Sequence, residues 1–307
     1  MIKTTLLLDL DDTLLDTNMD VFGPAYFGAL SAALAEEVSP DIMLPALMGG
    51  TKAMMDNRDP RRTLQEVFTG TFFPMLGLEQ ERLTSKIYHF YQEIFPTLGN
   101  LTGQRPEAIQ FVRWAVAANH RVGVATNPYF PLKAVKHRMN WAGLPAGDFP
   151  FAFISSYETF HFTKESPMYF LECLSQLGNP EGPVLMVGND LDMDLIPAQR
   201  AGLPIFWLRN SGEKDHQEIP QGNFSDLQAW LEKVDPEEIT PNFSSVDSIL
   251  SQLAATPAAL GTLTDQTEPE TWRRKPEKDE WCLTEVMCHL RDVEKEVNLP
   301  RVEKFLL

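Results

Sequence analysis

The stretch that decides the fold is Leu6-Leu7-Leu8-Asp9-Leu10-Asp11-Asp12-Thr13-Leu14, in which a short apolar run ends in carboxylates. Side chains alternate between the two faces of a strand, so Asp9 and Asp11 leave on the same side if the strand geometry persists past Leu8. Two carboxylates this close repel each other unless a cation or a shared proton intervenes. The pair predicts a nucleophile beside a metal-binding acid/base residue; the plainer alternative is an acidic turn after an edge strand.

The composition is that of an ordinary globular protein. The chain has 307 residues, of which 43% are hydrophobic and 22% are charged, and this length suggests about two domains. A net charge of −17 repels phosphate backbones and anionic lipid, so we expect neither nucleic-acid nor membrane-surface binding. An acidic protein that handles phosphorylated substrates needs a local cation, supplied by a metal ion or a well-placed lysine.

The sequence predicts a cytoplasmic location. No run of about 18 apolar residues suggests a membrane span, and the Leu6–Leu8 run is too short for a signal peptide. The three cysteines (Cys173, Cys282 and Cys288) are odd in number and lack the C-x-x-C spacing of a metal site. They fit a reducing cytoplasm better than a disulfide framework.

Short apolar runs alternate with helical patterns over much of the chain. The runs predict strands at 5–8, 122–125, 152–154, 184–187 and 204–208. The helical patterns that lie between the later runs are 106–119, 131–141 and 167–177. Strands that are apolar throughout are buried on both faces, and strands that alternate with helices form parallel sheets. We therefore predict an α/β fold, a Rossmann-like doubly wound parallel sheet.

Residues 18–98 interrupt this alternation, because they contain only helical patterns such as 25–37 and 83–94, with a turn expected at Gly49-Gly50. An all-helical insertion after the first strand is typical of a small cap domain, which can exclude water and select the substrate. The α/β core would then comprise residues 1–17 and 99–233.

The C-terminal part has a different character. The acidic stretch 234–243 contains two prolines and predicts a linker. Beyond it, residues 244–307 carry apolar side chains at helical spacing, with Thr284 or a nearby residue as the cap of the last helix.

The carboxyl ends of parallel strands open onto one crevice, where ligands bind. Reactive side chains stand at four such places: Asp9 and Asp11; Thr126 and Asn127; Lys164; and Asp190 and Asp194. This set suits phosphoryl transfer, because one carboxylate can attack phosphorus and a second acid can protonate the leaving oxygen. A hydroxyl and an ammonium group can hold phosphoryl oxygens, while carboxylates can hold a magnesium ion that relieves their repulsion.

The order and spacing of these segments resemble the four motifs of the haloacid dehalogenase (HAD) superfamily of phosphotransferases. The motif residues are Asp9, Asp11 and Thr13 in the first, Thr126 in the second, Lys164 with Pro167 slightly later in the third, and Asp190 and Asp194 in the fourth. The resemblance implies that Asp9 is the nucleophile and Asp11 the general acid/base. It also implies that the insertion is a helical cap of the C1 type.

The resemblance further implies a magnesium site and a phosphate site. Magnesium would be held by Asp9, the Asp11 backbone carbonyl and Asp190, with Asp194 as a ligand or a support for the site and for Lys164. Thr126, Asn127 and Lys164 would hold the substrate phosphate. Dehalogenases of the family lack the second aspartate of the first motif, so Asp11 disfavours dehalogenase activity.

Each of these residues has a plainer explanation when it is taken alone. Thr126 could be a polar strand end, Lys164 a solvated surface lysine, and the acids at 190–194 a helix start. Their occurrence in order, each beside a strand end, favours the functional interpretation. His120 precedes a strand and is expected to be structural, and His161 is expected to be a surface-loop residue despite its closeness to Lys164.

The segment from Trp281 to Asp292 (WCLTEVMCHLRD) resembles the start of a DinB-like four-helix bundle. In that family a histidine matching His289 is one of three metal ligands, and the others come from a later helix. The metal site is therefore expected to be incomplete within this sequence. Two helices cannot bury both apolar faces alone, so they would pack on the α/β core, form a homodimer with another copy, or belong to a longer bundle. The alternative is an amphipathic helical appendage.

Three functions follow from the sequence. The first is magnesium-dependent hydrolysis of a small phosphorylated metabolite through an aspartyl-phosphate on Asp9. The second is a phosphomutase, which would need a cap that excludes water. The third is a binding or regulatory protein that uses residues 244–307 as its partner module; the intact motif set disfavours it. No residue pattern in the cap identifies the substrate.

Overall fold

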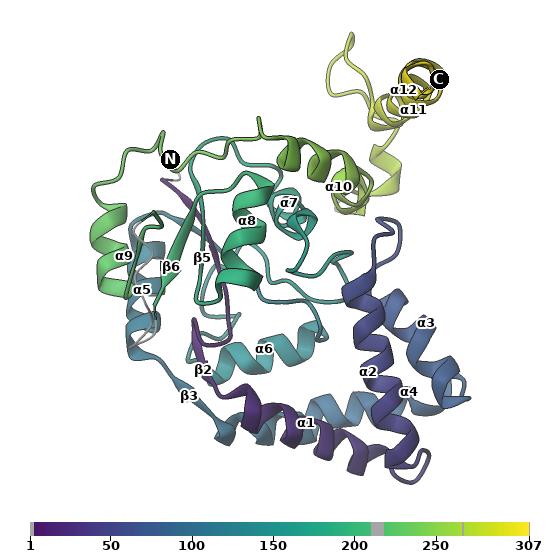
Figure 1. Ribbon diagram of the computed structural model, residues 1–307, viewed down its shortest axis with the longest axis vertical. Coiled ribbons are helices and arrows are strands. Elements are labelled where there is room, and N and C mark those ends of the chain that lie inside the picture. Colours follow the sequence, from purple (N-terminus) through teal and green to yellow (C-terminus); the bar gives the residue numbers. More distant parts are fainter. Residues whose placement is uncertain (1–2, 210–217, 266, 307) are drawn as a thin grey trace. The chain divides into compact units, whose positions relative to one another are not determined.

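The computed structural model describes residues 3–209, 218–265 and 267–306. The chain divides into two compact units, Met1–Leu260 and Gly261–Leu307. The first unit contains a β-sheet with helices between its strands and a helical insertion (Figure 1), and the second contains short C-terminal helices. No helix among the described residues has the length and apolarity needed to span a membrane.

The sheet of the first unit is wholly parallel and confirms the predicted fold class. Its strands run in the order β4-β1-β5-β6-β7. Their bounds are Thr5–Leu8 (β1), Arg121–Val124 (β4), Val184–Gly188 (β5), Ile205–Leu208 (β6) and Gln221–Gly222 (β7). Since β1 pairs with β4 on one side and β5 on the other, the chain crosses the sheet in both directions from β1. Such a reversal opens a crevice at the carboxyl ends of the strands.

Alternate residues of β1, β5 and β6 enter two different cores. Leu7 and Met186 join the core beneath α7 (Pro167–Gln176) and α8 (Ile196–Ala201). Leu6 and Leu8 join the core beneath α5 (Pro106–Ala117), α6 (Leu132–Trp141) and α9 (Phe224–Leu231). Figure 1 shows α5 and α9 on the opposite side of the sheet from α7 and α8. Burial on both faces explains why the strands are apolar throughout.

The segment predicted as a strand at 152–154 lies against β4 but forms only an isolated bridge, between Ile154 and Val124. Its backbone bonds to β4: Ala152 N donates to the Val122 carbonyl at 2.8 Å, and the Phe153 carbonyl accepts from Val124 N at 3.0 Å. The backbone then leaves the sheet, since Ser155 Oγ donates to the Thr126 carbonyl at 2.7 Å and the chain turns back at 156–160. The Ser155 hydroxyl thus satisfies the Thr126 carbonyl, which a backbone N–H would bind if the strand were longer.

The insertion between β1 and β4 is helical, as predicted, and is called the cap below. Its helices are α1 (Met19–Leu34), α2 (Pro40–Asp56), α3 (Leu64–Leu76) and α4 (Gln80–His89), followed by a π-helical turn η1 (Phe90–Ile94) and a 3-10 helix η2 (Phe95–Leu101). The two ends of the cap meet in an antiparallel ribbon of β2 (Leu15–Thr17) and β3 (Thr102–Gln104). The sequence did not predict this ribbon, because three-residue strands carry almost no periodic signal.

The turn predicted at Gly49-Gly50 was wrong, because both glycines lie inside α2. A Cβ on Gly50 would lie 2.7 Å from the ring of Phe68 in α3, and one on Gly49 would lie 2.5 Å from the Met75 sulfur. The glycines therefore allow α2 and α3 to approach closely. Packing between the two helices outweighs the poor helix propensity of glycine.

The C-terminal part begins with α10 (Val246–Asp265), in which Ala255 and Ala258 are buried against the core under α7 and α8. The segment predicted to be a linker, 234–243, contacts the core: Ile239 is buried and its carbonyl accepts from Val184 N at 2.8 Å. The domain boundaries stay a prediction.

The second unit contains η4 (Pro269–Thr271), α11 (Leu283–Val293), η5 (Glu294–Asn298) and α12 (Leu299–Leu306). Cys282 is the N-cap of α11, and its backbone N–H donates to Glu285 at 2.9 Å. Thr284 lies inside the helix and donates to the Trp272 carbonyl at 3.0 Å. His289 packs edge-on against Trp281, with 4.7 Å between the ring centroids.

The close approach of α2 and α3 can be tested with two glycine substitutions. Gly50→Ala should lower the free energy of unfolding by about 1–2 kcal/mol, because overpacking costs more than the improved helix propensity contributes. Gly28→Ala in α1 is the matched control: no atom lies within 4 Å of its new Cβ, so stability should rise by about 0.5–1 kcal/mol. Chemical denaturation measures both changes, and equal stabilisation by the two variants would contradict the packing argument.

Candidate active site

Asp9 lies at the carboxyl end of the central strand β1. The Asp9 backbone N–H donates to the Val187 carbonyl of β5 at 3.0 Å, while the Leu8 carbonyl accepts from Ala125, just after β4, at 2.7 Å. The first carboxylate is thus fixed between the ends of both neighbouring strands. It is 6% exposed, so an unpaired charge here would be costly.

The ammonium group of Lys164 lies between two buried carboxylates. Lys164 Nζ is 2.5 Å from Asp9 Oδ1 and 2.6 Å from Asp194 Oδ1. Burial lowers the pKa of Lys164, but the Asp194 and Asp9 carboxylates outweigh it and raise that pKa above its usual value. Three residues from three separate segments therefore form one ion-paired group, held in place largely by Lys164.

Asp194 also organises the loop after β5. Its Oδ2 accepts from the Asp190 backbone N–H at 3.1 Å. Asp190 in turn caps η3 (Leu191–Leu195), because its Oδ1 accepts from the N–H groups of Asp192 and Met193 at 2.9 and 3.0 Å. The Asp190 side chain is exposed at the crevice while Asp194 is buried. The two acids of this loop are thus held in different environments.

Asp11 is held by a residue that the sequence reasoning missed. Its Oδ1 accepts from Thr17 Oγ1 at 2.9 Å and from the guanidinium of Arg138 in α6. The signal was available: Arg138 stands among Ala134, Val135 and Met139 on the buried face of α6, where a charged residue needs a partner. The Asp9–Asp11 pair therefore has two cations beside it, one for each acid.

Arg138 joins the site to the cap. Its guanidinium lies over the rings of Phe22 in α1 and Phe130, at 5.6 and 5.1 Å from the ring centroids. Burial lowers the pKa of Arg138 to about 10, partly offset by the charge of Asp9, so the group is still charged at neutral pH.

The second predicted motif lies beside the third. The Thr126 carbonyl accepts from Ser155 Oγ at 2.7 Å and from Tyr169 OH at 2.8 Å, which fixes the end of β4. Asn127 Oδ1 accepts from the Lys164 backbone N–H at 3.4 Å. Thr13 Oγ1 donates to Asn189 Oδ1 at 2.9 Å and joins the first motif to the fourth.

A family model for haloacid dehalogenase-like hydrolases matches residues 3–202. The chain belongs to this family. The match covers the cap and strands β1, β4 and β5 but ends before β6, β7 and the C-terminal segment, so the DinB-like resemblance stays a prediction from sequence.

Individual relatives are distant. Pyrimidine 5'-nucleotidase YjjG from Escherichia coli strain K12 is 29% identical over 143 residues, which are 46% of this chain and 59% of that protein. The structure of 2-haloacid dehalogenase from Pseudomonas syringae pv. Tomato DC3000 covers 76% of this chain and 99% of its own, at 22% identity and a TM-score of 0.53. That likeness concerns the fold alone.

A magnesium-bound structure exists for another HAD-type hydrolase, YfnB from Bacillus subtilis. It is 21% identical, covers 75% of this chain and 99% of its own, and has a TM-score of 0.43. Magnesium binding thus occurs among HAD proteins.

The residues at the crevice of this HAD chain fit a magnesium ion in their chemistry. The hydrogen bonds described above use only Oδ1 of Asp9 and Oδ1 of Asp190. Within the described part of the chain, no three His, Cys, Asp or Glu side chains are arranged to hold a metal. An ion would therefore be held by two carboxylates, the Asp11 carbonyl, and water or substrate oxygens, which is a usual set for magnesium. Asp194 uses both oxygens elsewhere, which favours a supporting role.

The two histidines considered from sequence lie outside this group. His161 Nδ1 is 2.6 Å from the buried carboxylate of Glu172 in α7, whose pKa is raised by burial. His120 packs against the ring of Trp114, and burial lowers its pKa. Each histidine thus contacts a neighbouring side chain of the α/β core that lies outside the ion-paired group, which indicates a structural role for both.

The ion-paired group predicts a pH-dependent loss of stability in Lys164→Met. Burial and the charge of Asp9 raise the pKa of Asp194 to about 7, well above the unfolded value, so ionised Asp194 destabilises the folded state as the pH rises through 7. Without the lysine, ionised Asp194 has no cation beside it and destabilises the folded state more. We expect the free energy of unfolding of Lys164→Met to lie about 3 kcal/mol below that of the wild type above pH 8, and this difference to shrink toward about pH 5.

The experiment is urea unfolding of the variant and the wild type in chelator at several pH values. Lys52→Met is the control, because Lys52 forms an exposed ion pair with Asp56 at 2.7 Å, and it should cost less than about 0.5 kcal/mol at every pH. A deficit for Lys164→Met that does not change with pH would contradict the assignment.

Proposed function

We propose that the chain is a phosphoric monoester hydrolase that acts on a small phosphorylated metabolite through an aspartyl-phosphate on Asp9. The observation that supports this most is the Lys164 ammonium, which lies within 2.6 Å of both Asp9 and Asp194 at the crevice. A cation so placed pairs with the proposed nucleophile and would draw phosphoryl oxygens toward it.

In the first step, the Asp9 carboxylate attacks phosphorus and the bond from phosphorus to the leaving oxygen breaks. Asp11 gives its proton to that oxygen, so the alcohol leaves neutral. Thr17 and Arg138 both contact Oδ1 of Asp11, which leaves Oδ2 as the oxygen to carry the proton. Thr126, Asn127 and Lys164 would hold the phosphoryl oxygens.

In the second step, Asp11 takes a proton from water, and the water oxygen attacks the phosphorus of the aspartyl-phosphate. The bond between phosphorus and the Asp9 oxygen breaks, inorganic phosphate leaves, and both aspartates return to their starting states. Asp11 thus acts as acid and then as base, which requires that one carboxyl group stay in place through both steps. Its bond from buried Arg138 supports that role.

Magnesium held by Asp9, the Asp11 carbonyl and Asp190 would neutralise charge on the phosphoryl group. Asp194 would keep Lys164 and the Asp190 loop in place. The name of the relative from Escherichia coli makes nucleoside 5'-monophosphates the first substrates to test. No step of this proposed reaction uses a residue of the C-terminal helices; a DinB-like metal ligand at His289 and a homodimer through these helices stay predictions from sequence.

Replacing the nucleophile should abolish turnover. Asp9→Asn should lower kcat for a phosphate ester by at least about 10³-fold, because the neutral amide cannot form the intermediate. Asp192→Asn is the control, since Asp192 is exposed and lies two residues from Asp190; it should keep nearly full activity. Hydrolysis by Asp9→Asn at the wild-type rate, with an unchanged circular dichroism spectrum, would refute the proposal.

Removal of divalent cations should also stop hydrolysis, and added magnesium should restore it. Asp190→Asn should raise the magnesium concentration needed for half-maximal activity by about tenfold, because the ion loses one charged ligand. Calorimetric titration of magnesium gives the same comparison without turnover. Full activity in chelator would remove the metal from the proposed reaction.

A further inference from the structure

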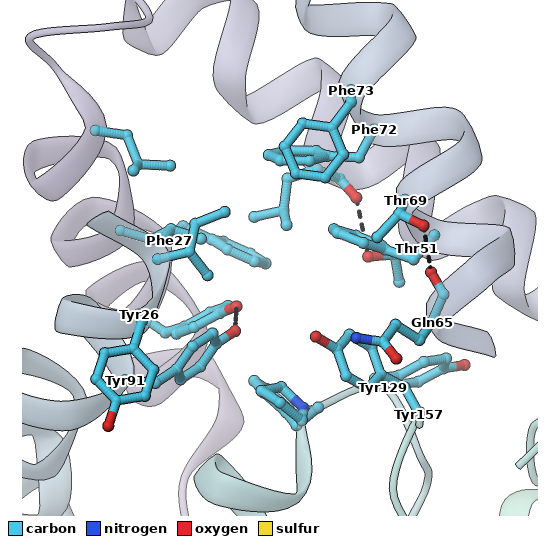
Figure 2. Close-up of a pocket in the computed structure, with 18 of the residues that line it drawn as sticks. Tyr26, Phe27, Thr51, Gln65, Thr69, Phe72, Phe73, Tyr91, Tyr129 and Tyr157 are labelled. Atoms are coloured by element: carbon cyan, nitrogen blue, oxygen red, sulfur yellow. Dashed lines mark hydrogen bonds between the residues drawn. The ribbon is translucent and has the colours of Figure 1, made fainter. Parts of the chain in front are cut away.

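The cap encloses a cavity of about 430 Å³, a size typical of sites for small molecules. Its walls come from α1, α2, α3, α4 and η1 of the cap and from loops of the core at 129–131 and 157. Figure 2 shows aromatic side chains from these segments directed toward one open centre, among them Phe27, Phe72 and Tyr91. The cavity therefore has a ring-rich surface that a ligand can contact.

None of the described residues that line the cavity carries a charge at neutral pH. Three of its tyrosines stay protonated: burial raises the pKa of Tyr26 to about 12 and also raises the pKa values of Tyr91 and Tyr157 above their usual range. A second phosphate in this space would be desolvated without a cation to pair with, which is costly. The cavity therefore suits an uncharged group better than a charged one.

Several polar groups of the cavity are already hydrogen-bonded. Thr51 and Thr69 donate to carbonyls of their own helices at 3.0 and 2.8 Å, and the hydroxyls of Tyr26 and Tyr91 lie 2.9 Å apart. On another side of the cavity, Figure 2 places the Gln65 amide beside two tyrosine side chains. An amide offers one acceptor and two donors, which suit the edge of a polar ring.

The cavity adjoins the proposed catalytic group. Tyr129 lines it and donates to Glu165, the neighbour of Lys164 in sequence. Phe22 and Phe130 also line it, and both rings contact Arg138, whose guanidinium binds Asp11. Residues of the cavity wall thus contact Arg138, which binds Asp11, and Glu165, which is next to Lys164 in sequence.

We propose that the cap cavity binds the leaving group, and that this group is uncharged and carries a planar ring, as in a nucleoside monophosphate or an aryl phosphate. This inference rests on the proposed phosphatase activity. Flat rings gain most from aromatic walls, which favour stacked and edge-on contacts. Sugar bisphosphates are disfavoured, because their second phosphate would enter a space without a cation.

The test compares five substrates on the full chain with magnesium. They are phenyl phosphate, uridine 5'-monophosphate, glycerol 3-phosphate, fructose 1,6-bisphosphate and acetyl phosphate. We expect kcat/KM for the better ring-bearing ester to exceed that for glycerol 3-phosphate by at least about tenfold, with the bisphosphate lowest. Equal or better turnover of glycerol 3-phosphate or the bisphosphate would overturn the inference.

Cavity variants link this preference to the rings. Phe72→Ala should reduce the ratio of kcat/KM for phenyl phosphate to that for acetyl phosphate by about tenfold, and half-buried Phe27→Ala provides a second variant should the first not fold. Met48→Ala is the control, because Met48 is 52% exposed on α2 and lies outside the cavity; it should leave the ratio unchanged. An unchanged ratio in both phenylalanine variants would overturn the inference.

Gln65→Leu distinguishes the two kinds of ring. A selective loss on uridine 5'-monophosphate would mean that the amide binds a nucleobase edge, and an equal effect on phenyl phosphate would mean that only the flat ring is recognised. Both results support a ring-bearing leaving group.

Failure of the phosphatase proposal would be visible separately, as no Asp9-dependent hydrolysis of any of the five compounds. Calorimetric binding to Asp9→Asn then still tests the cavity. Phenyl phosphate should bind at least about tenfold more tightly than glycerol 3-phosphate, and equal affinities would overturn the inference.

Discussion

The repulsion between two buried carboxylates, Asp9 at the end of β1 and Asp194 after β5, is the constraint on which the site depends. Lys164 offsets this repulsion, because its ammonium lies within 2.6 Å of both Asp9 and Asp194. Such an arrangement is stable only when the partners are close and their other atoms are satisfied. Asp194 therefore bonds to the backbone of the Asp190 loop as well, and the ends of β1 and β5 are tied to the segment that carries Lys164.

A second cation extends this network from the site to the cap. Arg138 is almost fully buried, contacts Asp11, and lies over the rings of Phe22 and Phe130. The same rings form part of the wall of the cap cavity. Arg138 thus contacts both Asp11, the acid proposed to protonate the leaving group, and the wall of the cavity proposed to hold that group. A change in the position of Phe22 in the cap would therefore alter the position of Arg138 and of Asp11.

Much of the fold could be predicted because its signals are local. Strand β1 matched its prediction at Thr5–Leu8, and β4, β5 and β6 fell within a residue of theirs, since strands buried on both faces are apolar throughout. Predictions from residue propensity and periodicity failed where packing between distant segments determines the local structure. Gly49 and Gly50 lie within a helix because Phe68 and Met75 need the space, and the β2–β3 ribbon joins segments too short and too distant in sequence to be recognised.

The sequence by itself determined the α/β class and the helical insertion, because strand and helix periodicity are local to each segment, and the order of its motifs predicted acids, a threonine and a lysine for the crevice. Only the tertiary structure decided which charges meet: that Lys164 contacts two acids, that Arg138 holds Asp11, and that the cap encloses an uncharged, ring-lined cavity. These facts depend on contacts between residues 30 to 155 positions apart. Such contacts leave no periodic trace in a single sequence, since they arise from packing rather than from local conformation.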